Sequence, residues 1–214
     1  MSDAAQLEAP VLSGVDFAAR TGATPAQVAD LERLQVLLAD WNGRMNLVSA
    51  ASLADYWGRH VLDSAQLLPL APAARSWVDI GAGAGFPGLV LAILLKDDPR
   101  AKVHLVESQT KRCRFLEAAV AELALPAEVH NVRAEDLKLK ADVVTARAVA
   151  PLARLLGFAR PYLAKGATGL FLKSESVAVE IDEARKSWRF TYDVVRSVSD
   201  SRGRIVKVEG LARA

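Results

Sequence analysis

The chain has 214 residues, a formal net charge of +2 and one cysteine, Cys113. A chain of this length can bury its own core without a structural metal, and one cysteine excludes a disulfide framework. The longest uncharged run, 80–95, is broken by four glycines and a proline, and residues 1–10 lack the apolar segment of a signal peptide. These features predict a monomer of the reducing cytoplasm, without membrane partner or metal site, in which Cys113 packs as a small hydrophobe.

The charge is distributed unevenly along the chain. Residues 1–99 carry a net charge of −5, whereas residues 100–214 carry +7. A basic half attracts polyanions because phosphate neutralisation releases counterions, so nucleic acid is a candidate partner. A solvated surface of mixed charges accounts equally well for the same composition.

The first 72 residues are predicted to form a helical N-terminal extension. Thr24 and Pro25 are typical of an N-cap and a first helical residue, and apolar residues then recur at three- and four-residue steps as far as Trp41. That helix is expected to end at Asn42-Gly43. A second helix is expected over residues 52–70, with Ser52 as its N-cap.

Residues 73–214 are predicted to form the main domain. Short apolar runs alternate there with helical stretches, which indicates βαβ units and a doubly wound, mostly parallel α/β sheet. Two further runs around the polar turn 199–203 predict a C-terminal antiparallel hairpin. The expected strands are 76–80, 102–107, 127–131, 142–146 and 168–173, the expected helices 87–96, 110–123 and 151–163, and the hairpin strands 189–198 and 203–210.

The loop after the first expected strand, residues 79–88, is rich in glycine. Ligands of open α/β sheets bind at the carboxyl ends of the strands, and glycines allow the backbone to approach a ligand closely. The dinucleotide fingerprint needs a third glycine where this chain has Phe86. A G-x-G-x-G loop after an acidic residue instead favours S-adenosylmethionine, with Asp79 beside its ammonium group. The glycines are Gly81, Gly83 and Gly85.

Residues after the second and third strands are expected to complete the cofactor site. Glu107 is placed to accept hydrogen bonds from ribose hydroxyls, a contact that fits S-adenosylmethionine and NAD alike. Ala134 and Glu135 are expected beside the adenine ring, although a solvated surface loop explains the same residues.

The loop after the fourth strand suggests the kind of atom that is methylated. It lacks the Asn/Asp-Pro-Pro-Tyr/Phe element of many methyltransferases that act on exocyclic amines. A ring nitrogen such as guanine N7 already presents a lone pair, so it needs alignment and charge stabilisation but no general base. Arg147 is the expected positioning residue and a cofactor contact, or else the partner of a neighbouring aspartate.

Other polar residues are weaker candidates. An RNA-facing rim is expected to include Lys111, Arg112, Lys165 and Lys173. Ordinary solvated cations on helix surfaces would give the same sequence pattern. His60 and Asp63 share a predicted helical face, where a structural hydrogen-bonded pair is the commoner explanation.

Several motifs along nearly the whole chain resemble one known family, the bacterial 16S ribosomal RNA guanine-N7 methyltransferases of the RsmG (GidB) type. The most specific are the Phe-Pro-Gly ending of the first loop, residues 86–88, and the Arg-Ala-Val-Ala-Pro-Leu stretch 147–152. The resemblance extends to 41–48, 60–64, 107–116, 133–135 and 172–173.

The resemblance implies a Rossmann-like methyltransferase that transfers a methyl group from S-adenosylmethionine to N7 of the guanine conventionally numbered 527 in 16S rRNA. It implies cofactor contacts for Gly81, Phe86, Ala134, Glu135 and Arg147. The family usually has Lys-Gly where this chain has Lys173-Ser174, and its C-terminal arginine corresponds to Arg202 or Arg204. The alternatives are an NAD-dependent oxidoreductase and a non-catalytic module that binds an adenosyl ligand or RNA.

Overall fold

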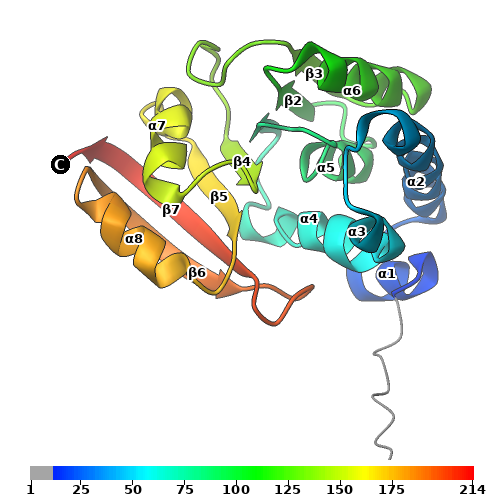
Figure 1. Ribbon diagram of the computed structural model, residues 1–214, viewed down its shortest axis with the longest axis horizontal. Helices are drawn as coiled ribbons and strands as arrows, with labels where there is room; N and C mark the ends of the chain where they lie inside the picture. The colour runs from blue at the N-terminus through cyan, green and yellow to red at the C-terminus, as the bar shows by residue number, and fades with distance from the viewer. Residues whose placement is uncertain (1–11) are drawn as a thin grey trace, which may run out of the picture.

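A seven-stranded sheet forms the centre of the protein (Figure 1). The computed structural model describes residues 12–214. The strand order is β3-β2-β1-β4-β5-β7-β6, and β1 to β5 are parallel, while β7 is antiparallel to both of its neighbours. The doubly wound sheet and the C-terminal hairpin are thus confirmed. The strands are β1 (Ser76–Ile80), β2 (Lys102–Val106), β3 (Ala127–His130), β4 (Val143–Arg147), β5 (Thr168–Lys173), β6 (Trp188–Arg196) and β7 (Arg204–Arg213).

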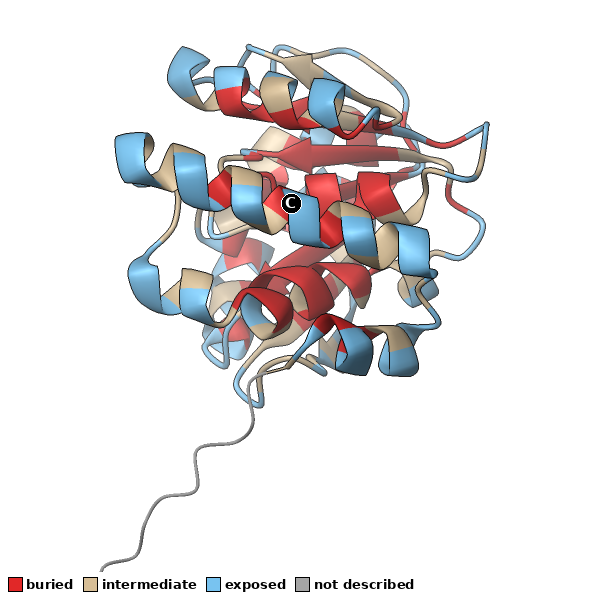
Figure 2. Cartoon of the chain, turned by 90° about the vertical axis from the view of Figure 1, so that its right-hand side faces the viewer, coloured by how far each residue is buried: buried red, intermediate tan, exposed pale blue. Residues whose placement is uncertain are grey.

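Helices cover the two faces of the sheet unequally. One face packs against α5, α6 and the N-terminal helices, and the other packs against α7 and α8. Buried residues therefore form two apolar clusters, one on each face of the sheet. Figure 2 shows the buried residues gathered in the sheet and on the inner sides of the helices. Between β3 and β4 the chain forms no helix. The helices named here are α5 (Gly88–Leu94), α6 (Thr110–Glu122), α7 (Leu152–Leu163) and α8 (Val177–Arg185).

Helix α8 is absent from the sequence prediction. Its buried residues, Val177, Ile181 and Ala184, recur at helical steps, so the sequence carries a helical apolar pattern that extends over only nine residues. No helix among residues 12–214 is long and apolar enough to cross a membrane.

The N-terminal helices differ from the prediction in two places. Helix α2 continues four residues beyond Trp41, to Met45, because Asn46 rather than Gly43 adopts the left-handed conformation that ends it. Thr24 caps this helix as expected. The helices are α1 (Gly14–Thr21), α2 (Pro25–Met45), α3 (Ala50–Ala54), η1 (Trp57–Leu62), α4 (Asp63–Ala65) and η2 (Leu68–Leu70).

The single helix expected over 52–70 is also wrong, since this stretch contains several short helical pieces. Ser49, not Ser52, caps the first of them, and the segment Trp57–Leu62 is a π-helix. The wider π turn brings residues from several sides of the segment into the core, whereas a regular amphipathic helix buries one face.

Candidate functional site

The loop between β1 and α5 follows a path that glycine permits. Gly81, Gly83 and Gly85 have φ angles of 66°, 55° and 87°, in the left-handed region that disfavours other residues. A Cβ on Gly81 would lie only 2.8 Å from Cγ2 of Val149, whereas a Cβ on Gly83 would have no neighbour closer than 3.6 Å. The loop is therefore tightly packed at Gly81 and open at Gly83.

Glu107 lies beside the open part of this loop. Its carboxylate accepts hydrogen bonds from the backbone N–H groups of Gly83, at 3.1 Å, and Gln109, at 2.7 Å. The guanidinium of Arg112 lies 3.8 Å away. These contacts fix a buried acceptor next to a stretch of backbone that has room for a ligand, as ribose recognition requires.

Asp79 lies beneath the loop and is only 1% exposed. One carboxylate oxygen accepts from the N–H of Gly88 at 2.9 Å, and the other accepts from the hydroxyl of Thr145 at 3.1 Å. Burial raises the pKa of Asp79 to about 7, against these hydrogen bonds and Arg147, which lower it. Asp79 thus ties the start of α5 to β4, and its contact with a cofactor ammonium stays a prediction.

The loop after β3 joins the same edge of the sheet. The side chain of Asn131 donates to the carbonyl oxygens of Glu107 and Ser108, at 3.1 and 3.0 Å. Ala134 is buried, its carbonyl accepts from the Tyr162 hydroxyl at 2.9 Å, and Glu135 beside it is exposed. Ala134 is therefore held on this edge, and the contacts of Ala134 and Glu135 with adenine stay a prediction.

These residues fit S-adenosylmethionine. The left-handed glycine cradle leaves space at Gly83, a fixed carboxylate lies beside that space, and the third-glycine position of a dinucleotide site is filled by the buried ring of Phe86. When bound, the cofactor supplies an electrophilic methyl group on a sulfonium.

A second group of residues meets this loop at Phe86. The His60 ring stacks on the Phe86 ring with centroids 4.4 Å apart, and the Arg147 guanidinium lies over the same ring at 5.2 Å. Segment η1 brings His60 to this point and the end of β4 brings Arg147. The cluster connects the cofactor loop to the N-terminal helices.

Arg147 is held by His60 and Asp63, the two residues expected to pair with each other on one helical face. Its guanidinium donates to Nδ1 of His60 at 2.8 Å and to the carbonyl of Arg59, and it lies 3.5 Å from the Asp63 carboxylate. Burial, reinforced by Arg147 and Arg59, lowers the pKa of His60 to about 3, so this ring is neutral and its Nδ1 accepts. His60 and Asp63 both contact Arg147, so the alternative in which Arg147 pairs with an aspartate is present, with Asp63 as that aspartate.

A polar cavity of about 1010 Å³ opens on the other side of Arg147. It lies between the N-terminal helices, the carboxyl ends of β4 and β5, and the β6–β7 turn. The turn is fixed there because Ser199 donates to Asp63 at 2.7 Å and the N–H of Val198 donates to Gln66 at 2.9 Å. Its lining is Ser49, Ser52, Asp55, Arg59, His60, Asp63, Arg147, Ala148, Leu172, Lys173, Ser174, Glu175, Glu180 and residues 199–203.

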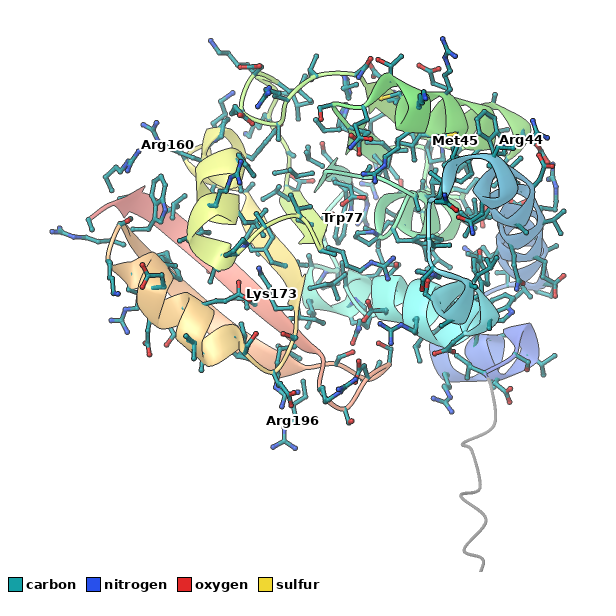
Figure 3. The ribbon with its side chains drawn as sticks, in the orientation of Figure 1. Arg44, Met45, Trp77, Arg160, Lys173 and Arg196 are labelled. Carbon is teal, nitrogen blue, oxygen red and sulfur yellow. The ribbon has the colours of Figure 1, made fainter. Side chains whose placement is uncertain are left out.

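The predicted RNA-binding cations do not lie together. Lys173 lines the cavity, but it is 9% exposed and bonded to Glu180 and to the Ala150 carbonyl, each at 2.7 Å. Figure 3 labels it between the α7–α8 half and the N-terminal helices. Lys111 is exposed at the start of α6, and Arg112 faces Glu107.

Lys165 lies apart from the other cations of the expected rim. This residue follows α7 and precedes β5, so it lies at the amino-terminal edge of the parallel strands, where its ammonium is 3.4 Å from the Leu139 carbonyl. Lys173 lies at the carboxyl edge. Arg202 lines the cavity, whereas the guanidinium of Arg204 donates to Ser201 and Gly203 carbonyls of its own turn.

The sheet order and the site at its carboxyl edge define a Rossmann-like methyltransferase fold. A putative O-methyltransferase from Klebsiella pneumoniae has a TM-score of 0.57 at 12% identity, over 92% of this chain and 97% of that chain. An O-methyltransferase from Bacillus cereus, solved with SAH, has a TM-score of 0.56 at 15% identity, over 85% of this chain and 91% of that one.

Sequence comparison then gives the family. The chain belongs to the GidB family, rRNA small subunit methyltransferase G, whose model matches residues 27–206. It is 61% identical over 203 residues to the ribosomal RNA small subunit methyltransferase G of Caulobacter vibrioides, covering 95% of this chain and 94% of the relative. The resemblance found in the sequence is thus confirmed.

Proposed function

We propose that the protein transfers the methyl group of S-adenosylmethionine to N7 of a guanine in small-subunit ribosomal RNA, the one conventionally numbered 527. Family membership supports methylation of this RNA and sets aside the NAD-dependent oxidoreductase. The observation that carries the proposal is the meeting of the cofactor loop and the polar cavity at Phe86 and Arg147.

Glu107 and the glycine loop hold the adenosine part of the cofactor, with Ala134 and Glu135 beside the base. The polar cavity would receive the guanine, whose N7 carries a lone pair and no proton, so it would take up the methyl group that the cofactor supplies without a general base. The positive charge then passes to the guanine ring. Asp63 lies on this side of Arg147, where its carboxylate is placed to offset that charge.

The neutral state of His60 supports this mechanism. Its pKa of about 3 keeps the ring uncharged at pH 7, and its Nδ1 lone pair is already used by Arg147. His60 therefore positions the arginine and accepts no proton from the substrate. Arg147 is the positioning residue on which the alignment of the guanine depends.

The setting of the reaction is also a proposal. Small-subunit rRNA, free or within a particle, is the partner, and the cytoplasm is the compartment, which suits the single buried Cys113. The protein acts as a monomer, with residues 1–72, of which 1–11 lie outside the described residues, as the N-terminal extension and residues 73–214 as the cofactor-binding domain.

The test is methylation of unmodified small-subunit RNA, free and as ribosomal particles, with methyl-labelled S-adenosylmethionine. N7-methylguanine carries a positive ring, so reduction followed by aniline should cut the labelled RNA at one guanine. Arg147→Ala should lose most of the label, whereas Glu117→Gln, on the exposed face of α6, should retain it. Label on an exocyclic amine, or no label from protein that binds the cofactor, would refute the proposal.

A further inference from the structure

The face of the sheet packed by α7 and α8 is left without a helix at its far end. Residues Val103 and Leu105 of β2 point into the core on the opposite face, so His104 between them points to the uncovered side. The register places His104 across from Glu128, and places Val106 across from His130. Three polar side chains of β2 and β3 therefore share one small area of the sheet.

These three side chains converge. Nδ1 of His104 and Nε2 of His130 are 2.9 Å apart, and a Glu128 carboxylate oxygen lies 3.9 Å from the same His130 nitrogen. One ligand atom from each residue lies within 4.8 Å of the other two. Two nitrogens bound to one zinc ion at about 2.0 to 2.1 Å are themselves roughly 3 Å apart, so the spacing of the pair suits a shared ion. The two nitrogens now face each other in a hydrogen bond, and the rings must turn to direct both lone pairs at the ion.

One competing cation lies beside the three side chains. Lys102 lies 3.2 Å from one Glu128 oxygen, which leaves the other oxygen for the ion but also places a competing cation beside the site.

We propose that His104, Glu128 and His130 form a binding site for a divalent transition metal of the zinc class, with water completing the coordination. Two imidazoles and one carboxylate match the ligand preference of such ions. The site lies on β2 and β3, away from the polar cavity, so we assign it no part in methyl transfer.

The position of the site gives it a structural consequence. β3 has four residues and is an edge strand of the sheet, so only β2 pairs with it. A metal ion would join the two strands through side chains in addition to their backbone hydrogen bonds. It would also fix His130, directly before the loop that carries Ala134 and Glu135.

The main test is zinc titration of the full chain without an affinity tag, followed by calorimetry. We expect one equivalent to bind, and either His104→Asn or His130→Asn to weaken it by more than about tenfold. Lys102→Met should tighten binding because it removes the competing cation. Glu128→Gln should also weaken zinc binding because it removes the carboxylate ligand. Glu117→Gln makes the same change on an exposed part of α6 and should leave binding unchanged.

A second measurement needs no variant. Co²⁺ added to the wild-type protein should shift and broaden the ring signals of His104 and His130 in the NMR spectrum while leaving those of His60 sharp. Unchanged signals at both rings, or zinc binding that survives in both histidine variants, would overturn the proposal. So would loss of zinc binding in Cys113→Ser, which would assign the ion to the thiol.

Discussion

The role of Glu107 in cofactor binding can be tested with one substitution. Glu107→Gln keeps the size of the side chain but removes its charge. The carboxylate accepts from the N–H groups of Gly83 and Gln109, and an amide has only one oxygen for these two donors. At 3.1 Å from the Gly83 nitrogen, an NH₂ group in place of the oxygen would repel the loop.

The expected loss follows from the hydrogen bonds that the charge makes. A hydrogen bond to a charged group contributes about 1.5–3 kcal/mol, and the ribose offers two hydroxyls. Since the amide retains part of one interaction, we expect a loss of about 1.5–3 kcal/mol, which is roughly a 10- to 150-fold weaker Kd. Calorimetry with S-adenosylhomocysteine measures this directly.

Glu117→Gln is the control for this substitution. It makes the same chemical change on an exposed part of α6 and should bind the ligand normally. Thermal unfolding of the unliganded proteins shows whether the Glu107 variant is folded. A folded Glu107→Gln protein that binds S-adenosylhomocysteine within threefold of wild type would refute the assignment of ribose recognition to this carboxylate.

Three further predictions concern RNA, catalysis and stability. RNA binding should weaken steeply with salt, and Lys111→Ala should flatten the salt slope by about 0.7–0.9 for each phosphate that the lysine neutralises; an unchanged slope would place this cation in solvent only. Single-turnover methylation at saturating cofactor should be nearly independent of pH between about 7.5 and 9, and Arg147→Ala should slow it uniformly; a log-linear rise that His60→Asn abolishes would reveal a general base. The raised pKa of Asp79 means that folding favours its protonated form, so its contribution to stability is full below about pH 3.8 and is lost as pH rises through about 7. Asp79→Asn should therefore reduce the fall in the free energy of unfolding between these pH values by up to about 4 kcal/mol. If the free energy of unfolding depends on pH in the same way in both proteins, the raised pKa is wrongly assigned to Asp79.

The sheet could be predicted from the sequence because its signals are local. Buried parallel strands are short apolar runs, and each of the five expected runs became a strand within one residue of the expected limits. The glycine loop was equally visible, since left-handed backbone at Gly81, Gly83 and Gly85 needs that residue type. Which atoms of the cofactor each residue contacts stays a prediction.

The parts that were missed depend on packing between distant segments. Arg147, His60 and Asp63 come together only because η1 packs against the end of β4, so spacing along the chain gave no sign of the cluster. The separation of Lys165 from Lys173 was missed for a related reason. A lysine after a helix lies at one edge of a parallel sheet and a lysine after a strand lies at the other, and charge alone does not distinguish them.

The N-terminal helices share one apolar core with the sheet, and this has a consequence for folding. Phe17 and Leu31 are fully buried in the same cluster as Leu89 and Phe115, and the Gln27 side chain donates to the Leu94 carbonyl at 3.1 Å. A fragment beginning at residue 73 would expose that face of α5 and α6 to water. The two segments therefore depend on each other for stability, and the chain is expected to melt in one cooperative transition, with tryptophan fluorescence and circular dichroism changing at the same temperature.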